Sequence, residues 1–188
     1  MNFLNFYKRK ENIRYKSFEF ALNEANIRNH RTIVETGVAR GKNKFFFFSK
    51  INWKDGMSTM IFSDYARHVN GQLYSCDISK MNILNAIKFT KKNKPFINFY
   101  NDDSLNFLLN FKKKIDFLYL DSLDGNFDNA SSHQLNEIIL AKKNLAKGSL
   151  VLLDDKNIKT NLSINYMLRN NFKIINETNE QVLLSLES

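Results

Sequence analysis

Three short apolar runs constrain the fold of this 188-residue chain more than any other feature of the sequence. They are RTIVET (31–36), IDFLYLD (115–121) and GSLVLLDD (148–155). Each run is nearly continuous in apolar residues rather than alternating, which is typical of β-strands that are covered on both faces. Two weaker runs lie between them, QLYSCD (72–77) and FINFYN (96–101). We therefore expect five strands of a largely buried sheet.

Segments with a helical period separate these runs. They are SKMNILNAIKFTKKN (79–93), DSLNFLLNFKKK (103–114) and SSHQLNEIILAKKNLAKG (131–148). The last carries a stripe of apolar residues on one helical face, namely Leu135, Ile138, Ile139, Ala141 and Leu145. Strands that alternate with helices predict an α/β fold, with a mostly parallel sheet and helices on both of its faces.

Turn signals mark where several elements end. Asn70-Gly71 and Lys147-Gly148 predict helix ends before the second and fifth strands. The segments NFKIINE and QVLLSLE flank Thr178-Asn179, so we expect two final strands that meet at a tight turn. They would form an antiparallel C-terminal edge on the sheet.

The length and the scarcity of linker residues favour a single domain over residues 1–188. Residues 1–29 are expected to form a helical cap that covers either the sheet or the site, with Phe18, Ala21, Leu22 and Ala25 on one face. Residues 30–188 are expected to form the α/β core. The run FFFF (45–48) is interpreted as a buried helix turn. The segment 51–68 is interpreted as an additional helix on the sheet or, alternatively, as part of a lid over the substrate.

Every one of the five expected strands ends in a carboxylate. These residues are Glu35, Asp77, Asp102 with Asp103, Asp121, and Asp154 with Asp155. Any one of them is readily explained as the cap of the following helix, but this explanation is strained for all five together. In an open parallel sheet, ligands bind beyond the carboxyl ends of the strands. The pattern therefore predicts a ligand site at that edge.

The stretch TIVETGVARG (32–41) carries the pattern E-x-G-x-x-x-G through Glu35, Gly37 and Gly41. Glycines let the backbone approach a ligand closely, and a helix starting near Gly41 would present its first N–H groups. The spacing differs from the dinucleotide fingerprint and from the phosphate-binding loop. A carboxylate at this place suits a ligand that carries a cation and sugar hydroxyls.

This arrangement resembles the class I S-adenosylmethionine-dependent methyltransferases over roughly residues 30–188. The resemblance implies a Rossmann-like sheet of seven strands with S-adenosylmethionine as the cofactor. It assigns the methionine moiety to the acidic glycine-rich loop, the ribose hydroxyls to the acid that ends the second strand, and the adenine to the turn after the third. The corresponding residues here are Glu35, Thr36, Gly37 and Gly41, then Asp77, then Asp103 and Ser104.

The fourth and fifth strand ends resemble those of the metal-dependent O-methyltransferases, which include catechol-type and sugar enzymes. FLYLDSLDG and VLLDD then imply that Asp121, Asp154 and Asp155 hold a divalent metal, with Mg²⁺ expected because carboxylate oxygens suit it. Two adjacent acceptor hydroxyls bound to such an ion would become more acidic. The Asn/Asp-Pro-Pro-aromatic turn of amino-group methyltransferases acting on bases is ruled out, because the only proline is Pro95.

The general base is assigned less directly. Relatives often carry His three residues after the first metal-binding Asp, whereas this chain has Asp124 there, followed by Gly125. Asp124 is therefore the candidate base, with an Asp-Gly turn as its alternative role. Asp121 would contact both metal and cofactor and is the second catalytic candidate. His133, facing either the site or solvent, and Lys156, alternatively a solvated lysine, are further possibilities.

The net charge of +9 raises the question of a polyanionic partner. The lysines are spread along the chain, and no stretch reaches the five or six like charges of a basic arm. The charge is therefore interpreted as a property of the overall composition, and the resemblance to metal-dependent O-methyltransferases implies a small hydroxylated acceptor such as a sugar or vicinal diol. RNA methylation and a non-catalytic methyltransferase-like binding module are the alternatives.

The single cysteine, Cys76, excludes a disulfide framework and a cysteine-rich zinc site, and it fits a reducing compartment. Lys8, Arg9 and Lys10 interrupt the N-terminal segment before an apolar stretch of signal length forms. No later run approaches the ~18 apolar residues of a membrane span. We therefore expect a cytoplasmic protein with no membrane contact.

Overall fold

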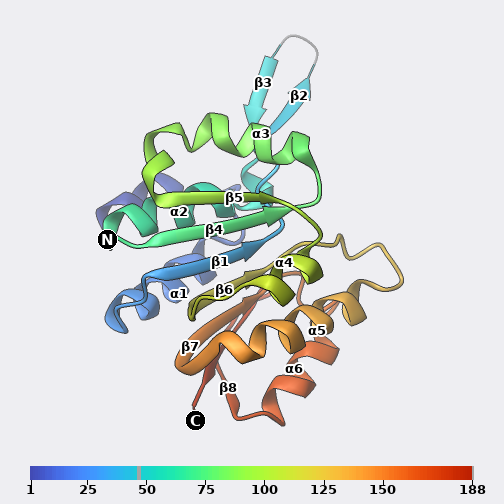
Figure 1. The fold of residues 1–188 in the computed structure, drawn as a ribbon. Coiled ribbons are helices and arrows are strands. Elements are labelled where there is room, and N and C mark those ends of the chain that lie inside the picture. Colours follow the sequence, from blue (N-terminus) through green and yellow to red (C-terminus); the bar gives the residue numbers. More distant parts are fainter. Residues whose placement is uncertain (46–47, 188) are drawn as a thin grey trace.

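The computed structural model describes residues 1–45 and 48–187 (Figure 1). Its centre is a seven-stranded sheet in the order β5-β4-β1-β6-β7-β9-β8. The strands are β1 (Thr32–Thr36), β4 (Gln72–Asp77), β5 (Ile97–Asn101), β6 (Ile115–Leu120), β7 (Leu145–Leu153), β8 (Phe172–Glu177) and β9 (Val182–Leu186).

The first five of these strands are parallel, and β9 runs antiparallel between β7 and β8. This confirms the predicted mostly parallel sheet with an antiparallel C-terminal hairpin. The strand order reverses around β1, which pairs with β4 on one side and with β6 on the other. Such a reversal opens a crevice beyond the carboxyl ends of the central strands.

Helices cover both faces of the sheet (Figure 1). They are α1 (Tyr15–Ile27), α2 (Ser58–His68), α3 (Lys80–Phe89), α4 (Ser104–Asn110), α5 (Ala130–Ala141) and α6 (Asn161–Leu168). Short 3₁₀ turns join them: η1 (Asn2–Tyr7), η2 (Trp53–Asp55), η3 (Lys91–Phe96) and η4 (Lys142–Asn144). Helices α1 and α2 pack on one face, and α4, α5 and α6 pack on the other.

Strand β6 explains why the apolar runs are continuous. Its Phe117 and Tyr119 face the layer of α1 and α2, while Leu118 and Leu120 face the opposite layer, and all four are fully buried. The ring of Phe62 on α2 lies 5.5 Å from that of Phe117 and 5.1 Å from that of Tyr119. A strand with a helical layer on each face has no side on which polar residues would meet water.

The N-terminal residues form part of this core. As predicted, Phe18, Ala21, Leu22 and Ala25 lie buried on one face of α1. The turn η1 lies over α2, where the Tyr7 hydroxyl donates a hydrogen bond of 2.7 Å to an Asp64 carboxylate oxygen. None of the helices in the described part of the chain combines the length and hydropathy that crossing a bilayer requires.

The segment after Gly41 differs from the prediction. No helix starts there; a two-stranded hairpin of β2 (Lys42–Phe45) and β3 (Phe48–Ile51) extends away from the sheet instead (Figure 1). Aromatic residues favour strand over helix, and Gly41 has a left-handed φ of +83°. The predicted helix turn at 45–48 is wrong for Phe45 and Phe48, while Phe46 and Phe47 lie outside the described residues.

Two further predictions need correction. The segment 51–68 holds no additional helix, because α2 is itself the crossover between β1 and β4. Helix α5 ends at Ala141, and β7 already begins at Leu145, so Gly148 lies within a strand, near an irregularity of the pairing between β6 and β7. The buried face of α5 includes the polar Gln134 and Glu137, whereas Ile139 is 45% exposed.

Candidate active site

The glycine-rich loop after β1 passes between the ends of two neighbouring strands. Gly37 has φ +81°, and its N–H donates to the Cys76 carbonyl oxygen at 2.9 Å. A Cβ atom on Gly37 would lie 2.1 Å from the Asp121 carbonyl oxygen, a distance no side chain tolerates. Glycine is therefore required here both by the backbone conformation and by the packing against the end of β6.

Two adjoining pockets open at this loop, and Gly37, Asp77, Ile78 and Ser122 line both of them. The first is also lined by Cys76, Asp103, Ser104, Leu123 and His133. The second is also lined by Val38, Ala39, Arg40, Ser58, Ser79, Asn82, Asp121 and Asp124. Six of the predicted site residues thus meet at the carboxyl ends of the strands, where the strand order reverses.

Asp77 ends β4 with a half-buried carboxylate in the wall of both pockets. The carboxylate accepts hydrogen bonds from Val38 N at 3.1 Å, Ser79 N at 2.7 Å and Asn82 Nδ2 at 3.3 Å. It therefore joins the glycine loop to the start of α3. Asn82 Nδ2 lies 3.3 Å from both oxygens, so one amide group is shared between them.

The turn after β5 has a structural role as well as a place in the first pocket. Asp103 caps α4 by accepting from Leu105 N at 2.9 Å and Asn106 N at 3.2 Å. Ser104 Oγ lies 2.9 Å from His133 Nε2, which in turn is 3.1 Å from Ser122 Oγ. Of the two orientations considered for His133, the structure therefore has the one toward the site.

Glu35 lies behind the glycine loop and lines neither pocket. It is fully buried, with Ser58 Oγ donating to Oε1 at 2.6 Å and Ser75 Oγ donating to Oε2. Burial raises the pKa of Glu35 to about 7, although hydrogen bonds from these serines act in the opposite direction. Thr36 is equally buried. Glu35 thus joins β1, β4 and the start of α2 beneath the site.

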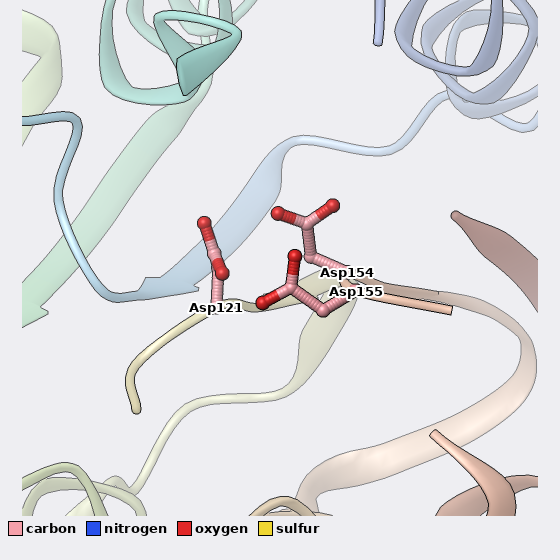
Figure 2. Close-up of side chains that lie close together, drawn as sticks. All are labelled: Asp121, Asp154 and Asp155. Carbon is pink, nitrogen blue, oxygen red and sulfur yellow. The ribbon is translucent and has the colours of Figure 1, made fainter. Parts of the chain in front are cut away.

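The predicted metal ligands come together at the ends of β6 and β7. Figure 2 shows Asp121 on one side and Asp154 with Asp155 on the other, and carboxylate oxygens of the three lie within 4.8 Å of one another. Asp154 is fully buried, and a left-handed φ of +55° at Asp155 turns the chain directly after it. Burial and the neighbouring Asp154 raise the pKa of Asp121 well above its usual range.

Two side-chain cations contact these carboxylates. Arg14 Nε lies 2.8 and 2.9 Å from the two oxygens of Asp154, and its Nη2 lies 3.2 Å from Asp155 Oδ1. Lys159 Nζ lies 3.0 Å from Asp121 Oδ1 and 3.1 Å from Asp155 Oδ2. The three carboxylates alone would suit Mg²⁺, but in this arrangement their oxygens already bind two cations. The residues as placed therefore do not fit a divalent ion.

Neither cation was among the candidates from the sequence. Lys156, which was considered, pairs instead with Glu177 at 2.6 Å. Lys159 stands four residues after Asp155, a spacing that favours an ion pair where the chain turns helically. Arg14 lies 140 residues from Asp154 in the sequence, so only the fold brings the two together.

The candidate base Asp124 lies at the rim of the second pocket, where its side chain is 57% exposed. Arg40 of the glycine loop contacts it at 3.1 and 3.3 Å. The guanidinium group of Arg40 thereby contacts both carboxylate oxygens of Asp124. Sequence reasoning also missed Glu137, a buried residue whose Oε1 lies 3.8 Å from His133 Nε2 and whose pKa is raised by burial.

Comparisons with known proteins agree with this architecture. The family described as a methyltransferase domain matches residues 53–156, which is more than half of the chain. No protein with a curated description matches the sequence.

Solved structures match over nearly the whole chain. The SAH-bound methyltransferase PaMTH1 from Podospora anserina has a TM-score of 0.65 at 11% identity, covering 92% of this chain and 78% of that one. The N-methyltransferase NodS from Bradyrhizobium japonicum WM9 has a TM-score of 0.64 at 12% identity, with coverages of 94% and 97%. An rRNA methylase from Streptococcus thermophilus has a TM-score of 0.64 at 11% identity, again with 94% and 97%. At these identities the likeness shows the fold alone, and it confirms the Rossmann-like sheet.

Proposed function

Because the chain belongs to the methyltransferase domain family, we propose that it transfers the methyl group of S-adenosylmethionine to a hydroxyl oxygen of a small acceptor. The observation that carries this proposal is the pair of adjoining pockets at the strand reversal, which share Gly37 and Asp77. One pocket would hold the cofactor's base and the other its methionine end and the acceptor. The SAH-bound structural neighbour supports the choice of cofactor.

The cofactor contacts follow from what each side chain offers. The Asp77 carboxylate would accept hydrogen bonds from the ribose hydroxyls. The backbone at Gly37 leaves room for the sulfonium-bearing chain, and the half-buried His133 and the buried Ser104 would border the adenine. The sulfonium group is positive, so Asp121 in the second pocket also provides a favourable charge.

The methyl transfer itself requires little covalent participation by the protein. The acceptor oxygen attacks the methyl carbon, the bond from carbon to sulfur breaks, and S-adenosylhomocysteine leaves. The hydroxyl proton must pass to a base. Both Asp121 and Asp124 line the second pocket and each contacts a side-chain cation, but Asp121 is the better candidate because its side chain is less exposed, 30% against 57%. Burial raises the pKa of Asp121, and a raised pKa makes the ionised carboxylate a stronger base. Metal assistance stays a prediction, and the ion pairs of Arg14 and Lys159 argue against it.

RNA methylation is the second candidate, favoured by the net charge of +9. Four lysines do gather around one hollow, namely Lys112, Lys113, Lys114 and Lys143. This hollow lies before β6 and β7, at the opposite end of the strands from the two pockets. Among the residues that line the two pockets, Arg40 and His133 are the basic ones. A small acceptor is therefore the better proposal.

The proposed function can be tested by comparing substitutions at two aspartates, Asp77 and Asp116, whose carboxylates both accept hydrogen bonds from backbone N–H groups. Asp77→Asn should weaken S-adenosylhomocysteine binding in calorimetry, because a charged acceptor for the ribose hydroxyls is lost. Asp116 is the control: it accepts from Arg31 N and Thr32 N at the other end of the sheet, so Asp116→Asn should affect stability without affecting binding. Wild-type protein that binds no S-adenosylhomocysteine at millimolar concentration would refute the proposed function.

A further inference from the structure

The carboxylate cluster of Asp121, Asp154 and Asp155 needs positive charge, because three carboxylates this close repel one another strongly away from water. The sequence alone left the source of that charge to a metal ion. In the structure, each member of the cluster contacts a side-chain cation of the same chain. We propose that Arg14 and Lys159 permanently take the place of the divalent ion, so that the cluster binds no metal and instead fixes the N-terminal segment against the active site.

Lys159 is a buried member of the cluster and not a surface residue that covers it. Its side chain is 2% exposed, and its ammonium group contacts Asp121 at 3.0 Å, Asp155 at 3.1 Å and the Leu123 carbonyl oxygen at 2.9 Å. These three acceptors match the three N–H donors of an ammonium group. A metal ion that displaced it would leave a buried ammonium without partners, which is strongly unfavourable.

Arg14 uses all three of its guanidinium nitrogens. Nε and Nη2 contact Asp154 and Asp155, and Nη1 donates to the Lys54 carbonyl oxygen at 2.8 Å. One side chain thereby joins three segments: the residue before α1, the turn η2 before α2, and the loop after β7. Only 13% of the side chain is exposed, so exchange with solvent ions is restricted.

The charges support the same conclusion. One arginine and one lysine together carry the charge of a single divalent ion, so the cluster with its two cations has the charge it would have with Mg²⁺ alone. Adding a divalent ion to the present arrangement would place it beside two cations among buried groups. Mg²⁺ also requires near-octahedral coordination by oxygens at about 2.0–2.1 Å, which these oxygens cannot supply while they bind Arg14 and Lys159.

Removing one cation should therefore create a metal site. Lys159→Met keeps most of the side-chain volume and removes the charge, so Asp121 and Asp155 lose their shared partner. Lys156→Met is the matched control, because Lys156 lies in the same loop and pairs with Glu177 outside the cluster. The melting temperature and the effect of the protein on water-proton relaxation by Mn²⁺ are measured for metal-stripped wild type and both variants.

We expect millimolar Mg²⁺ or Mn²⁺ to leave the melting temperature of the wild type and of Lys156→Met unchanged. Lys159→Met should melt at a lower temperature, recover part of the loss with Mn²⁺, and alter the relaxation signal. Stoichiometric Mn²⁺ binding by the wild type, or a wild-type melting temperature that rises with Mg²⁺, would overturn the proposal. If Lys159→Met does not fold, the wild-type relaxation measurement decides, and Arg14→Met is the second variant. None of these readouts needs cofactor or acceptor, so they stand apart from the test of the proposed function.

Discussion

Replacing Glu35 by glutamine should change how the stability of the protein depends on pH. Glu35 is fully buried at the end of β1 and accepts hydrogen bonds from Ser58 and Ser75. Burial raises its pKa from 4.5 to about 7, so the fold favours the protonated side chain. Glutamine has the same shape and no charge, and its amide can accept from one serine and donate to the other.

The sign and the size of the effect follow from linkage. Because the pKa of Glu35 is higher in the folded than in the unfolded state, its stabilising contribution is complete below pH 4.5 and is lost as the pH rises toward about 7. Above that pH the side chain is ionised in both the folded and the unfolded state, so its contribution to the unfolding free energy no longer changes with pH. The interval between the two pKa values corresponds to about 3 kcal/mol of unfolding free energy. The Glu35→Gln variant should lack this loss.

Urea unfolding of both proteins between about pH 4 and pH 8 measures the effect. The unfolding free energy of the wild type minus that of Glu35→Gln should fall across this range by about 3 kcal/mol. Glu11→Gln, at an exposed position, is the control and should follow the wild type. A wild-type minus Glu35→Gln difference that is independent of pH would show that Glu35 has no raised pKa, and the reasoning would be refuted.

Three further outcomes are expected. Gly37→Ala should abolish S-adenosylhomocysteine binding in calorimetry, because its Cβ would collide with the Asp121 carbonyl oxygen. The control is Gly148→Ala, which is also at positive φ but has open space around it; it should lower the unfolding free energy by about 1 kcal/mol and leave binding intact. Equal effects of the two substitutions on binding would contradict this reasoning. Tyr7→Phe should lower the unfolding free energy by about 1 kcal/mol in urea titrations through loss of the hydrogen bond to Asp64, so an unchanged midpoint would speak against that contact. Binding of generic RNA in filter or anisotropy assays should be weak and disappear between roughly 50 and 200 mM salt, whereas tight, selective binding at physiological salt would restore RNA as the acceptor.

The strands could be predicted because short, continuous apolar runs are typical of strands that are covered on both faces. In β6, Phe117 and Tyr119 alternate with Leu118 and Leu120, and the two pairs are buried in opposite layers. The hairpin of β2 and β3 could not be predicted in the same way. A glycine after a strand is compatible with a helix start or with a turn, and the choice depends on how the following chain packs.

The active site was predictable where it depends on strand order alone. Asp121 and Asp154 end adjacent parallel strands, so their meeting follows from the sheet. The cations that neutralise these carboxylates cannot be predicted from the strand order, because Arg14 lies far away in the sequence and reaches the cluster through the packing of α1. The orientation of the Glu35 side chain could not be predicted from the sequence either. Its place before the glycine loop suggested contact with a ligand, whereas its side chain turns toward Ser58 and Ser75 beneath that loop.

The position of β1 also affects how the protein acquires its fold. Ile33 pairs with Leu73 on one side and with Phe117 on the other, so the central strand is completed only by contacts between residues far apart in the sequence. High contact order of this kind slows folding, because the entropy of closing long loops is lost before the strands can pair. Both pockets take residues from the ends of β1, β4 and β6, so no partly folded form that lacks β6 can contain them. A ligand of these pockets would therefore bind only after the central sheet has assembled, and it would slow unfolding rather than guide the early steps of folding.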